Sequence, residues 1–323
     1  MKNLRRILIA IKSPAARSQP ALRKAAQIAS ASGARLTLFH AITSPVYMDA
    51  FAIEGMSLQQ TQRQWRARAE ARLEQLAGPL RKEGIVVDVS CEWDFPAYEA
   101  IIRRAVRNDA DLIVAERHAT RHVLPWLLRF NDWELLRRSP VPVLLIKRPQ
   151  AYRKTAVLAA IDPSHSFAKP AKLDAEILAA ANLMALTLNG KLHVAHAWQG
   201  VTMPMELDSL SAGLSVNVNR RASSAARAAF AAALKSAGIS KARRHFVAGN
   251  PVDVLPALTR KHHVGIVVMG AVSRSGLKRL VVGNIAEQVL DSLSCDVLVL
   301  KPNDFKARVR SKVRGVQLVP TPT

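Results

Sequence analysis

The chain has 323 residues, of which 49% are hydrophobic, and a formal net charge of +23 at pH 7. This length is enough for two domains that each bury a core, and no apolar stretch of the sequence approaches the roughly 20 residues that cross a bilayer. The two cysteines, Cys91 and Cys295, exclude a disulfide framework, and an aromatic content of 5% argues against a surface that stacks nucleic-acid bases.

The positive charge is spread over both halves of the chain, which is typical of a solvated surface. A net charge of this size still predicts weak, nonspecific attraction to nucleic acid and other polyanions at low salt. Near the N-terminus basic residues precede an apolar run, but that run covers only residues 7–11. Secretory signals need a longer run and a cleavage site, so we expect a first strand and a cytoplasmic protein.

Residues 1–149 alternate between apolar runs and amphipathic segments. The expected strands are residues 7–11, 35–41, 85–91 and 112–115, followed by a short helix and a fifth strand. The expected helices are about residues 19–32, 58–82 and one that opens at Pro96, since proline is tolerated in the first turn of a helix.

Residues 150–302 follow the same plan. Their expected strands are residues 157–161, 191–197, 243–248, 266–269 and 297–300. Their expected helices are about residues 168–188, 214–236 and 285–293, with another that opens at Pro251. We expect Gly84 and Gly238 to end the long helix of each half as C-terminal caps.

The second half repeats the first. RILIAI at residues 6–11 matches AVLAAI at 156–161, and SPVPVLLIK at 139–147 matches LSCDVLVLK at 293–301. From residue 111 to 147 the offset between the copies stays at 154 residues without a gap. The chain is therefore an internal duplication, with domains at residues 1–149 and 150–302 and a basic tail at residues 303–323.

The expected strands are nearly continuous apolar runs that alternate with helices, which predicts a parallel sheet covered on both faces. With right-handed crossovers this gives an α/β fold of two tandem, doubly wound sheets with five parallel strands each. Ligands bind such sheets at the carboxyl ends of the strands, where the strand order reverses.

The clearest motif lies between residues 267 and 300. Gly270 ends an apolar strand, a basic loop follows, and Gly283-Asn284 opens a helix. Backbone amides at that point can face a phosphate, because glycine has no Cβ and a helix N-terminus carries partial positive charge. Five residues separate Gly270 from Gly276, and Leu277 follows, so this is not a Walker loop.

The run SRSGLKRLVVGN at residues 273–284 resembles the nucleotide-binding loop of the universal stress protein family, in which Gly-x2-Gly-x9-Gly-Ser/Thr surrounds the phosphates of ATP. Ser273 stands where that motif has its second glycine, and Asn284 where it has Ser or Thr. The alternative is a glycine loop that only turns the chain.

The resemblance extends over nearly the whole chain, as far as about Pro302, and is strongest to tandem members of the E type. It is carried by DFPAYEAIIRRA, NDWELLRRSPVPVLLIK and GNIAEQVLDSLSCDVLVLKP. It implies the family's fold, the adenine nucleotide alpha hydrolase-like fold, with strand order 3-2-1-4-5. It also implies a cytoplasmic stress-response protein that is associated with survival of stress, including DNA damage. Members of this type have no established reaction, and only some members of the family bind ATP. The resemblance further implies either a homodimer or a monomer whose two domains imitate the dimer of single-domain members.

By position, the resemblance implies a nucleotide site in the second domain. Asp162 would lie near the nucleoside, the backbone of Ala197 would meet the base, and Met269 and Gly270 would border the ribose. The amides that would line the phosphate path belong to Ser273, Gly276, Gly283, Asn284 and Ile285.

The first copy lacks the glycines of this loop. The offset places bulkier or charged residues at the loop positions: Glu116 at Gly270, Ala119 at Ser273, His122 at Gly276, Arg129 at Gly283 and Phe130 at Asn284. Lys12 stands in the place of Asp162. We therefore expect the first domain to be a structural partner and any nucleotide to bind the second.

The histidines and the remaining polar residues show no pattern typical of a catalytic or metal site. His193 and His196 are three apart on an expected strand and so point to opposite faces. His262 and His263 adjoin a helix end, where a cationic ring favours the helix dipole. We find no nucleophile elbow in the sequence, and Asp162 alone forms no acid–base pair, so we expect a non-enzyme, with a slow ATPase as the weakest hypothesis.

The tail alternates basic and other residues. Its cations are Lys306, Arg308, Arg310, Lys312 and Arg314. An extended tail would present them all on one side as an arm for polyanions, whereas a solvated, disordered tail is the other interpretation. Two functions thus stay open: a stress-response binding and signalling module that takes an adenine nucleotide or another small ligand, or a stress protein that binds nucleic acid and keeps a vestigial crevice.

Overall fold

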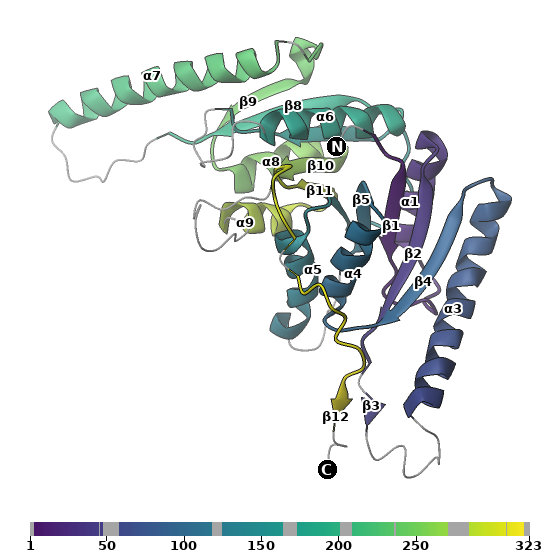
Figure 1. Ribbon diagram of the computed structural model, residues 1–323. Helices are drawn as coiled ribbons and strands as arrows, with labels where there is room; N and C mark the ends of the chain where they lie inside the picture. Colours follow the sequence, from purple (N-terminus) through teal and green to yellow (C-terminus); the bar gives the residue numbers. More distant parts are fainter. Residues whose placement is uncertain are drawn as a thin grey trace. The chain divides into compact units, whose positions relative to one another are not determined.

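The computed structural model describes residues 3–44, 46–47, 58–117, 125–163, 173–200, 209–235, 237–270, 284–307 and 309–319 (Figure 1). The chain divides into two compact units. The first comprises Asn3–Tyr152 and Asn303–Thr323, and the second comprises Arg153–Pro302. The first unit is therefore built from two separate stretches of the chain.

The first unit is a parallel α/β sheet with helices between the strands. Its elements are β1 (Arg6–Ala10), α1 (Pro20–Ser32), β2 (Arg35–Ile42), α3 (Leu58–Lys82), β4 (Val87–Trp93), α4 (Ala97–Arg107), β5 (Leu112–Glu116), α5 (Pro125–Arg138) and β6 (Val143–Ile146). The strand order is β4-β2-β1-β5-β6, and every pair is parallel. This confirms the expected order 3-2-1-4-5.

The second unit repeats this topology. Its elements are β7 (Ala156–Ala160), α6 (Leu173–Thr187), β8 (Leu192–Trp198), α7 (Ser209–Ala233), β9 (Arg244–Ala248), α8 (Pro251–Lys261), β10 (Val264–Gly270), α9 (Asn284–Ser292) and β11 (Asp296–Leu300). The order is β9-β8-β7-β10-β11, again with parallel pairs. The predicted duplication is thus present as two copies of one fold.

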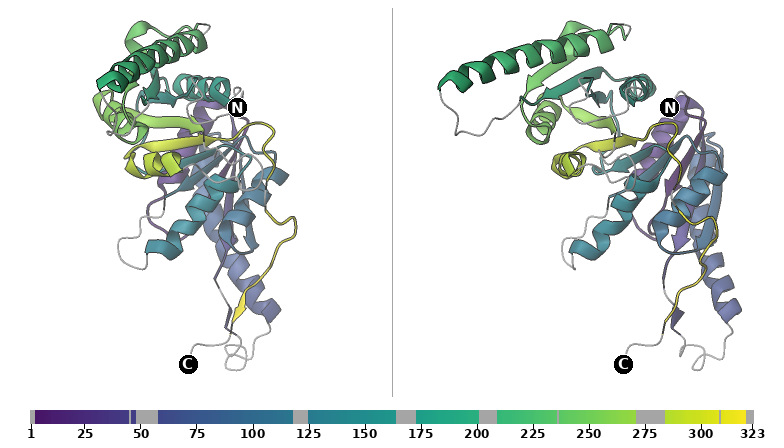
Figure 2. Two further views of the ribbon diagram at one scale, coloured as in Figure 1. Left: turned by 90° about the vertical axis from the view of Figure 1, so that its left-hand side faces the viewer. Right: turned by 60° about the vertical axis from the view of Figure 1, so that its left-hand side comes forward.

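The strands form the core of each unit. All residues of β6 and β11 are buried, as are four of the five residues of β5 and of β7. Right-handed crossovers place the helices that precede and follow the reversal of strand order on opposite faces. Accordingly α4 packs on α5 and α8 on α9, while Figure 2 shows α7 and α8 on opposite sides of the second sheet.

One of the two predicted glycine caps is present. Gly84, after α3, has φ +85°, and Gly238, after α7, has φ +60°. These left-handed conformations let glycine end a helix without a Cβ clash. α3 therefore ends where the sequence predicted, whereas α7 already ends at Ala233, five residues before Gly238, so Gly238 turns the chain but does not cap the helix.

Candidate functional site

The reversal of strand order in the second unit lies between β7 and β10, which pair directly. Met269 is opposite Ala160 at the carboxyl end of this pair, and Ala160 is opposite Ala195 of β8. Asp162, Ala197 and Gly270 therefore all lie at the carboxyl edge of three neighbouring strands. Three of the residues predicted from the sequence thus share one edge of the sheet.

Asp162 is held in a buried position at this edge. Its backbone N–H donates to Asp174 Oδ1 of α6 at 3.1 Å, and only 4% of the residue is exposed. His196 of β8 lies beneath it, with Nδ1 3.1 Å from the carbonyl oxygen of Ile161 and 3.8 Å from Asp162 Oδ1. The turn after β7 is thus anchored to both α6 and β8.

Gly270 allows close packing of α6. A Cβ built on this glycine would come within 2.6 Å of Leu173 Cδ2 and 3.4 Å of Ile177 Cδ1. Real Cβ atoms do not approach other atoms at the first of these distances, so the Leu173 side chain would have to shift to admit a larger residue. The glycine at the end of β10 therefore has a structural reason that does not involve a ligand.

The loop that follows Gly270 lies outside the described residues. The predicted phosphate contacts Ser273, Gly276 and Gly283 are in that segment. The helix that we expected after it begins at Asn284, with Ile285 next. Because α9 connects the parallel strands β10 and β11, its N-terminus faces the carboxyl ends of those strands. The first amides of a helix lack partners inside it and attract anions there.

The first unit differs at this point. Its helix α5 begins at Pro125, four residues before Arg129, the residue that the repeat aligns with Gly283. The alignment therefore places Arg129 and Phe130 within a helix, whereas Gly283 directly precedes one. Glu116 ends β5 where Gly270 ends β10, while Ala119 and His122 lie outside the described residues.

Comparison with known proteins identifies the fold. The model of the universal stress protein family matches residues 3–147 and again residues 155–301. The chain belongs to the universal stress protein family.

Relatives named universal stress protein E cover this chain almost entirely. The one from Photorhabdus laumondii is 26% identical over 317 residues, which are 96% of this chain and 99% of the relative. The one from Escherichia coli K12 is 26% identical over 311 residues, 94% of this chain and 96% of the relative. Two family domains and relatives of this kind show a tandem universal stress protein of the E type.

Solved structures share the fold of this chain. A functionally unknown protein from Pseudomonas aeruginosa PAO1 has a TM-score of 0.71 and 27% identity, over 94% of this chain and 95% of that chain. A universal stress protein from Archaeoglobus fulgidus has a TM-score of 0.61 at 16% identity, over 92% and 97%, and shows the shared fold alone.

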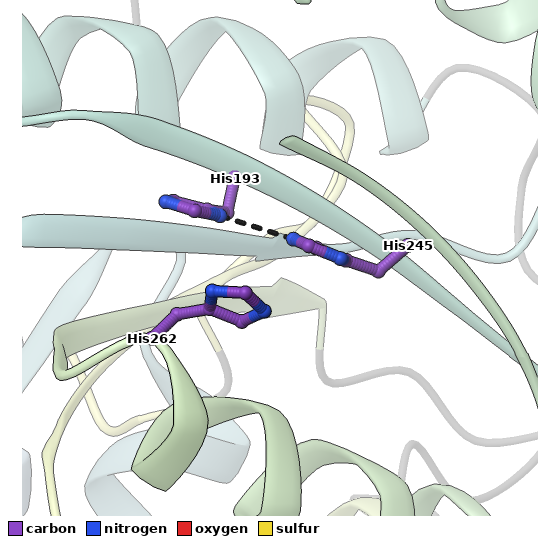
Figure 3. Close-up of side chains that lie close together, drawn as sticks. All are labelled: His193, His245 and His262. Atoms are coloured by element: carbon purple, nitrogen blue, oxygen red, sulfur yellow. Dashed lines mark hydrogen bonds between the residues drawn. The ribbon is translucent and has the colours of Figure 1, made fainter. Parts of the chain in front are cut away.

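A histidine cluster in the second unit was missed by the sequence analysis. His193 of β8, His245 of β9 and His262, which caps the end of α8, turn their rings toward one another (Figure 3). His193 Nδ1 lies 3.0 Å from His245 Nε2, and the ring centroids of His245 and His262 are 4.5 Å apart. His193 and His196 do point to opposite faces, because His196 packs against Phe230 of α7.

Burial makes two of these rings poor bases. Desolvation, followed by repulsion from His262, lowers the pKa of His193 and lowers that of His245 to about 4. The nearby cations Lys191, Arg243 and Lys261 act in the same direction. The sequence carried no spacing signal for this cluster, since its members come from three elements.

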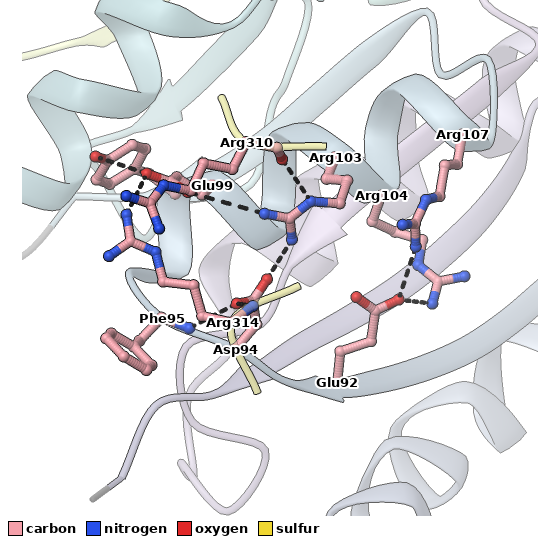
Figure 4. Close-up of polar contacts among 10 residues, drawn as sticks. Glu92, Asp94, Phe95, Glu99, Arg103, Arg104, Arg107, Arg310 and Arg314 are labelled. Atoms are coloured by element: carbon pink, nitrogen blue, oxygen red, sulfur yellow. Dashed lines mark hydrogen bonds and ion pairs between the residues drawn. The ribbon is translucent and has the colours of Figure 1, made fainter. Parts of the chain in front are cut away.

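The basic tail, for which the sequence left open an extended arm or a solvated, disordered tail, makes specific contacts within the first unit. Arg314 donates from its backbone N–H to Asp94 Oδ1 at 2.9 Å and from its guanidinium to Glu99 Oε1 at 3.0 Å (Figure 4). Arg103, itself ion-paired with Asp94, donates to the carbonyl oxygen of Arg310 at 2.9 Å. The physical reason is an acidic pair more than 200 positions away in sequence, which a local reading of the tail cannot reveal.

The tail also forms a short strand pair. β12 (Leu318–Val319) runs parallel to β3 (Val46–Tyr47).

None of the helices in the described ranges is both long and apolar enough to span a membrane. Both cysteines are buried and form no disulfide with each other, and burial raises the pKa of the Cys91 thiol to about 12.

Proposed function

We propose that this tandem universal stress protein is a stress-response binding and signalling module whose second unit takes one adenine nucleotide. The observation that supports it most is the convergence at one edge of the sheet. Asp162 follows β7 and Gly270 ends the adjacent strand β10 at the reversal of strand order, and α9, whose N-terminus faces the same edge, begins at Asn284. This is where doubly wound sheets bind ligands.

In this proposal each element of the edge has one task. The Asp162 carboxylate accepts a hydrogen bond from a ribose hydroxyl, and the backbone of Ala197 meets the base. Met269 and Gly270 border the ribose. The phosphates lie against amides of the loop and of the helix start, which belong to Ser273, Gly276, Gly283, Asn284 and Ile285.

Thermal unfolding with and without ATP tests the proposal. A ligand at about 100 times its Kd stabilises the folded state by about 2.7 kcal/mol, which for a domain of this size raises Tm by roughly 5–10 °C. We expect that shift for the full chain. Gly283→Arg introduces the residue that the first repeat has at the aligned position, and we expect it to abolish the shift.

A matched control separates the loss of the site from the added charge. Gly78 lies in α3 of the first unit, and apart from the neighbouring backbone of its own helix no atom lies within 4 Å of a Cβ built there. Gly78→Arg should keep the full ATP-dependent shift. If ATP leaves Tm unchanged in the unmodified chain, or if Gly283→Arg keeps the shift, the proposal fails.

The second candidate is binding of polyanions, which the net charge of +23 favours. The contacts of Arg314 with Asp94 and Glu99 weigh against a free basic arm, because they engage one of its charges within the first unit. Nucleic-acid binding that persists at 200 mM salt and is lost when residues 303–323 are removed would favour this candidate. ATP hydrolysis abolished by Gly283→Arg is what a slow ATPase requires.

A further inference from the structure

The histidine cluster occupies positions that the first unit fills with other polar residues. Register gives the correspondence: Val157 pairs with Leu192 as Ile7 pairs with Leu36, so His193 corresponds to Thr37. Ala195 pairs with His245 as Phe39 pairs with Ser90. His262 and Asn108 are the residues that follow α8 and α4.

The first unit thus has Thr37, Ser90 and Asn108 at the same three places, with Asn108 Nδ2 3.4 Å from Thr37 Oγ1. The fold itself does not require histidine there. A hydroxyl–amide contact serves one copy, whereas the other copy has three imidazoles. The difference calls for an explanation specific to imidazole.

The ring nitrogens are spaced closely enough to share an ion. One nitrogen from each ring can be chosen so that all three lie within 4.8 Å of one another. Zinc binds histidine nitrogen at about 2.0–2.1 Å, which puts tetrahedral ligands roughly 3.3–3.4 Å apart. The His193–His245 pair is already at 3.0 Å. A shift of His262, which is partly exposed at the end of its helix, closes the remaining distance.

We propose that His193, His245 and His262 form a transition-metal site at the second unit's sheet, with Zn²⁺ as the expected ion. Imidazole suits Zn²⁺, Cu²⁺ and Ni²⁺, and three neutral ligands leave a fourth position for water or an anion. Among the described residues no carboxylate or thiolate joins the three rings. Lys191, Arg243 and Lys261 repel a cation, so we expect micromolar rather than tighter binding.

This site is separate from the proposed nucleotide crevice. His193 is the second residue of β8, near its amino end, whereas Ala197 and the crevice belong to the carboxyl end. His262 follows α8, which runs back from the carboxyl edge to the start of β10. Failure of one site therefore says nothing about the other.

Zinc titration of the untagged, chelator-stripped full chain tests the site. We expect one saturable Zn²⁺ per chain in competition with a chromophoric chelator. The variants His193→Thr, His245→Ser and His262→Asn each introduce the residue found at the same place in the first unit, which favours correct folding. Each should weaken Zn²⁺ binding at least about tenfold, since even loss of a residue that only supports a ligand costs that much.

His263→Asn is the matched control. His263 is exposed beside the cluster and has φ +50°, a conformation that asparagine tolerates. It should leave Zn²⁺ binding unchanged, and Co²⁺ should give a tetrahedral visible spectrum that His245→Ser abolishes. No saturable binding at micromolar Zn²⁺, binding that survives all three cluster variants, or equal loss in His263→Asn would each overturn the site.

Discussion

In each unit a histidine of the second strand contacts a backbone carbonyl just after the first strand. His40 Nδ1 lies 2.8 Å from the carbonyl oxygen of Ile11, and His196 Nδ1 lies 3.1 Å from that of Ile161. Because a carbonyl only accepts, Nδ1 carries the proton in both rings. Each ring thus ties the turn after the first strand to the second strand, and in the second unit that turn carries Asp162.

The half-buried ring of His40 predicts a pH-dependent stability. Burial lowers its pKa more than the hydrogen bond to Ile11 raises it. The unfolded chain therefore takes up a proton near its ordinary pKa of about 6.5 while the folded chain does not, and stability is lost as pH falls through that value towards the lower folded pKa. His40→Gln keeps an N–H donor and cannot titrate.

Urea unfolding at about pH 7.5 and about pH 5.5 measures this dependence. Four of the five tryptophans belong to the first unit, so fluorescence reports mainly on its unfolding. The unmodified chain should lose more stability between the two pH values than His40→Gln does. An equal loss in both proteins would show that His40 does not contribute.

Single residues were predictable where a strand end fixed their position. Asp162 and Gly270 follow apolar runs, so sequence alone placed them at one edge of the sheet. The histidine cluster was not predictable, because it depends on the register of β8 against β9 and on where α8 ends. Such contacts leave no local spacing in the sequence.

At the scale of elements, the start of one helix distinguishes the two units. The helix after the fourth strand begins at Asn284 in the second unit, directly after Gly283. In the first unit it begins at Pro125 and already includes the aligned position Arg129. The amphipathic pattern predicts that both helices exist, but not that the earlier one starts sooner.

The tail is a second feature at this scale, since its docking depends on buried charges. Asp94 is fully buried and Arg103 is 5% exposed, and the tail adds Arg314 to this group. Removing one partner of a buried ion pair leaves an uncompensated charge and typically costs about 3–5 kcal/mol. We expect Asp94→Asn to destabilise the first unit by about 3 kcal/mol.

Asp109→Asn provides the control for that prediction. Asp109 pairs with Arg6 at 3.0 Å, but the two side chains are 83% and 50% exposed. An exposed pair contributes little, so the free energy of unfolding should change by less than about 1 kcal/mol. Urea unfolding of both variants makes the comparison. Equal losses would mean that the group around Asp94 contributes no more than a surface ion pair.

Most elements could be predicted because their signals are local. Buried strands give apolar runs and long helices give amphipathic ones, so the observed bounds of β1, α3 and β11 lie within about one residue of expectation. β3 and β12 have two residues each, too few to form a pattern. Their pairing depends on chain segments more than 270 positions apart.

At the scale of the whole molecule, duplication has produced two units that share a topology and differ in the residues at their proposed binding sites. The first unit is completed by the end of the chain, because residues 303–323 belong to it rather than to the second unit that precedes them. The second unit has the proposed crevice and the proposed metal site. We infer that the first copy has become a scaffold and that the second has kept the binding surfaces.

The number of nucleotides that each chain binds tests most directly whether the second unit alone binds a ligand. Equilibrium dialysis of the full chain against radiolabelled ATP, at a salt concentration that suppresses nonspecific attraction, measures that number. The account predicts one saturable site per chain, retained in Gly78→Arg and absent from Gly283→Arg. Two sites per chain, no saturable site, or one site that survives Gly283→Arg would contradict it.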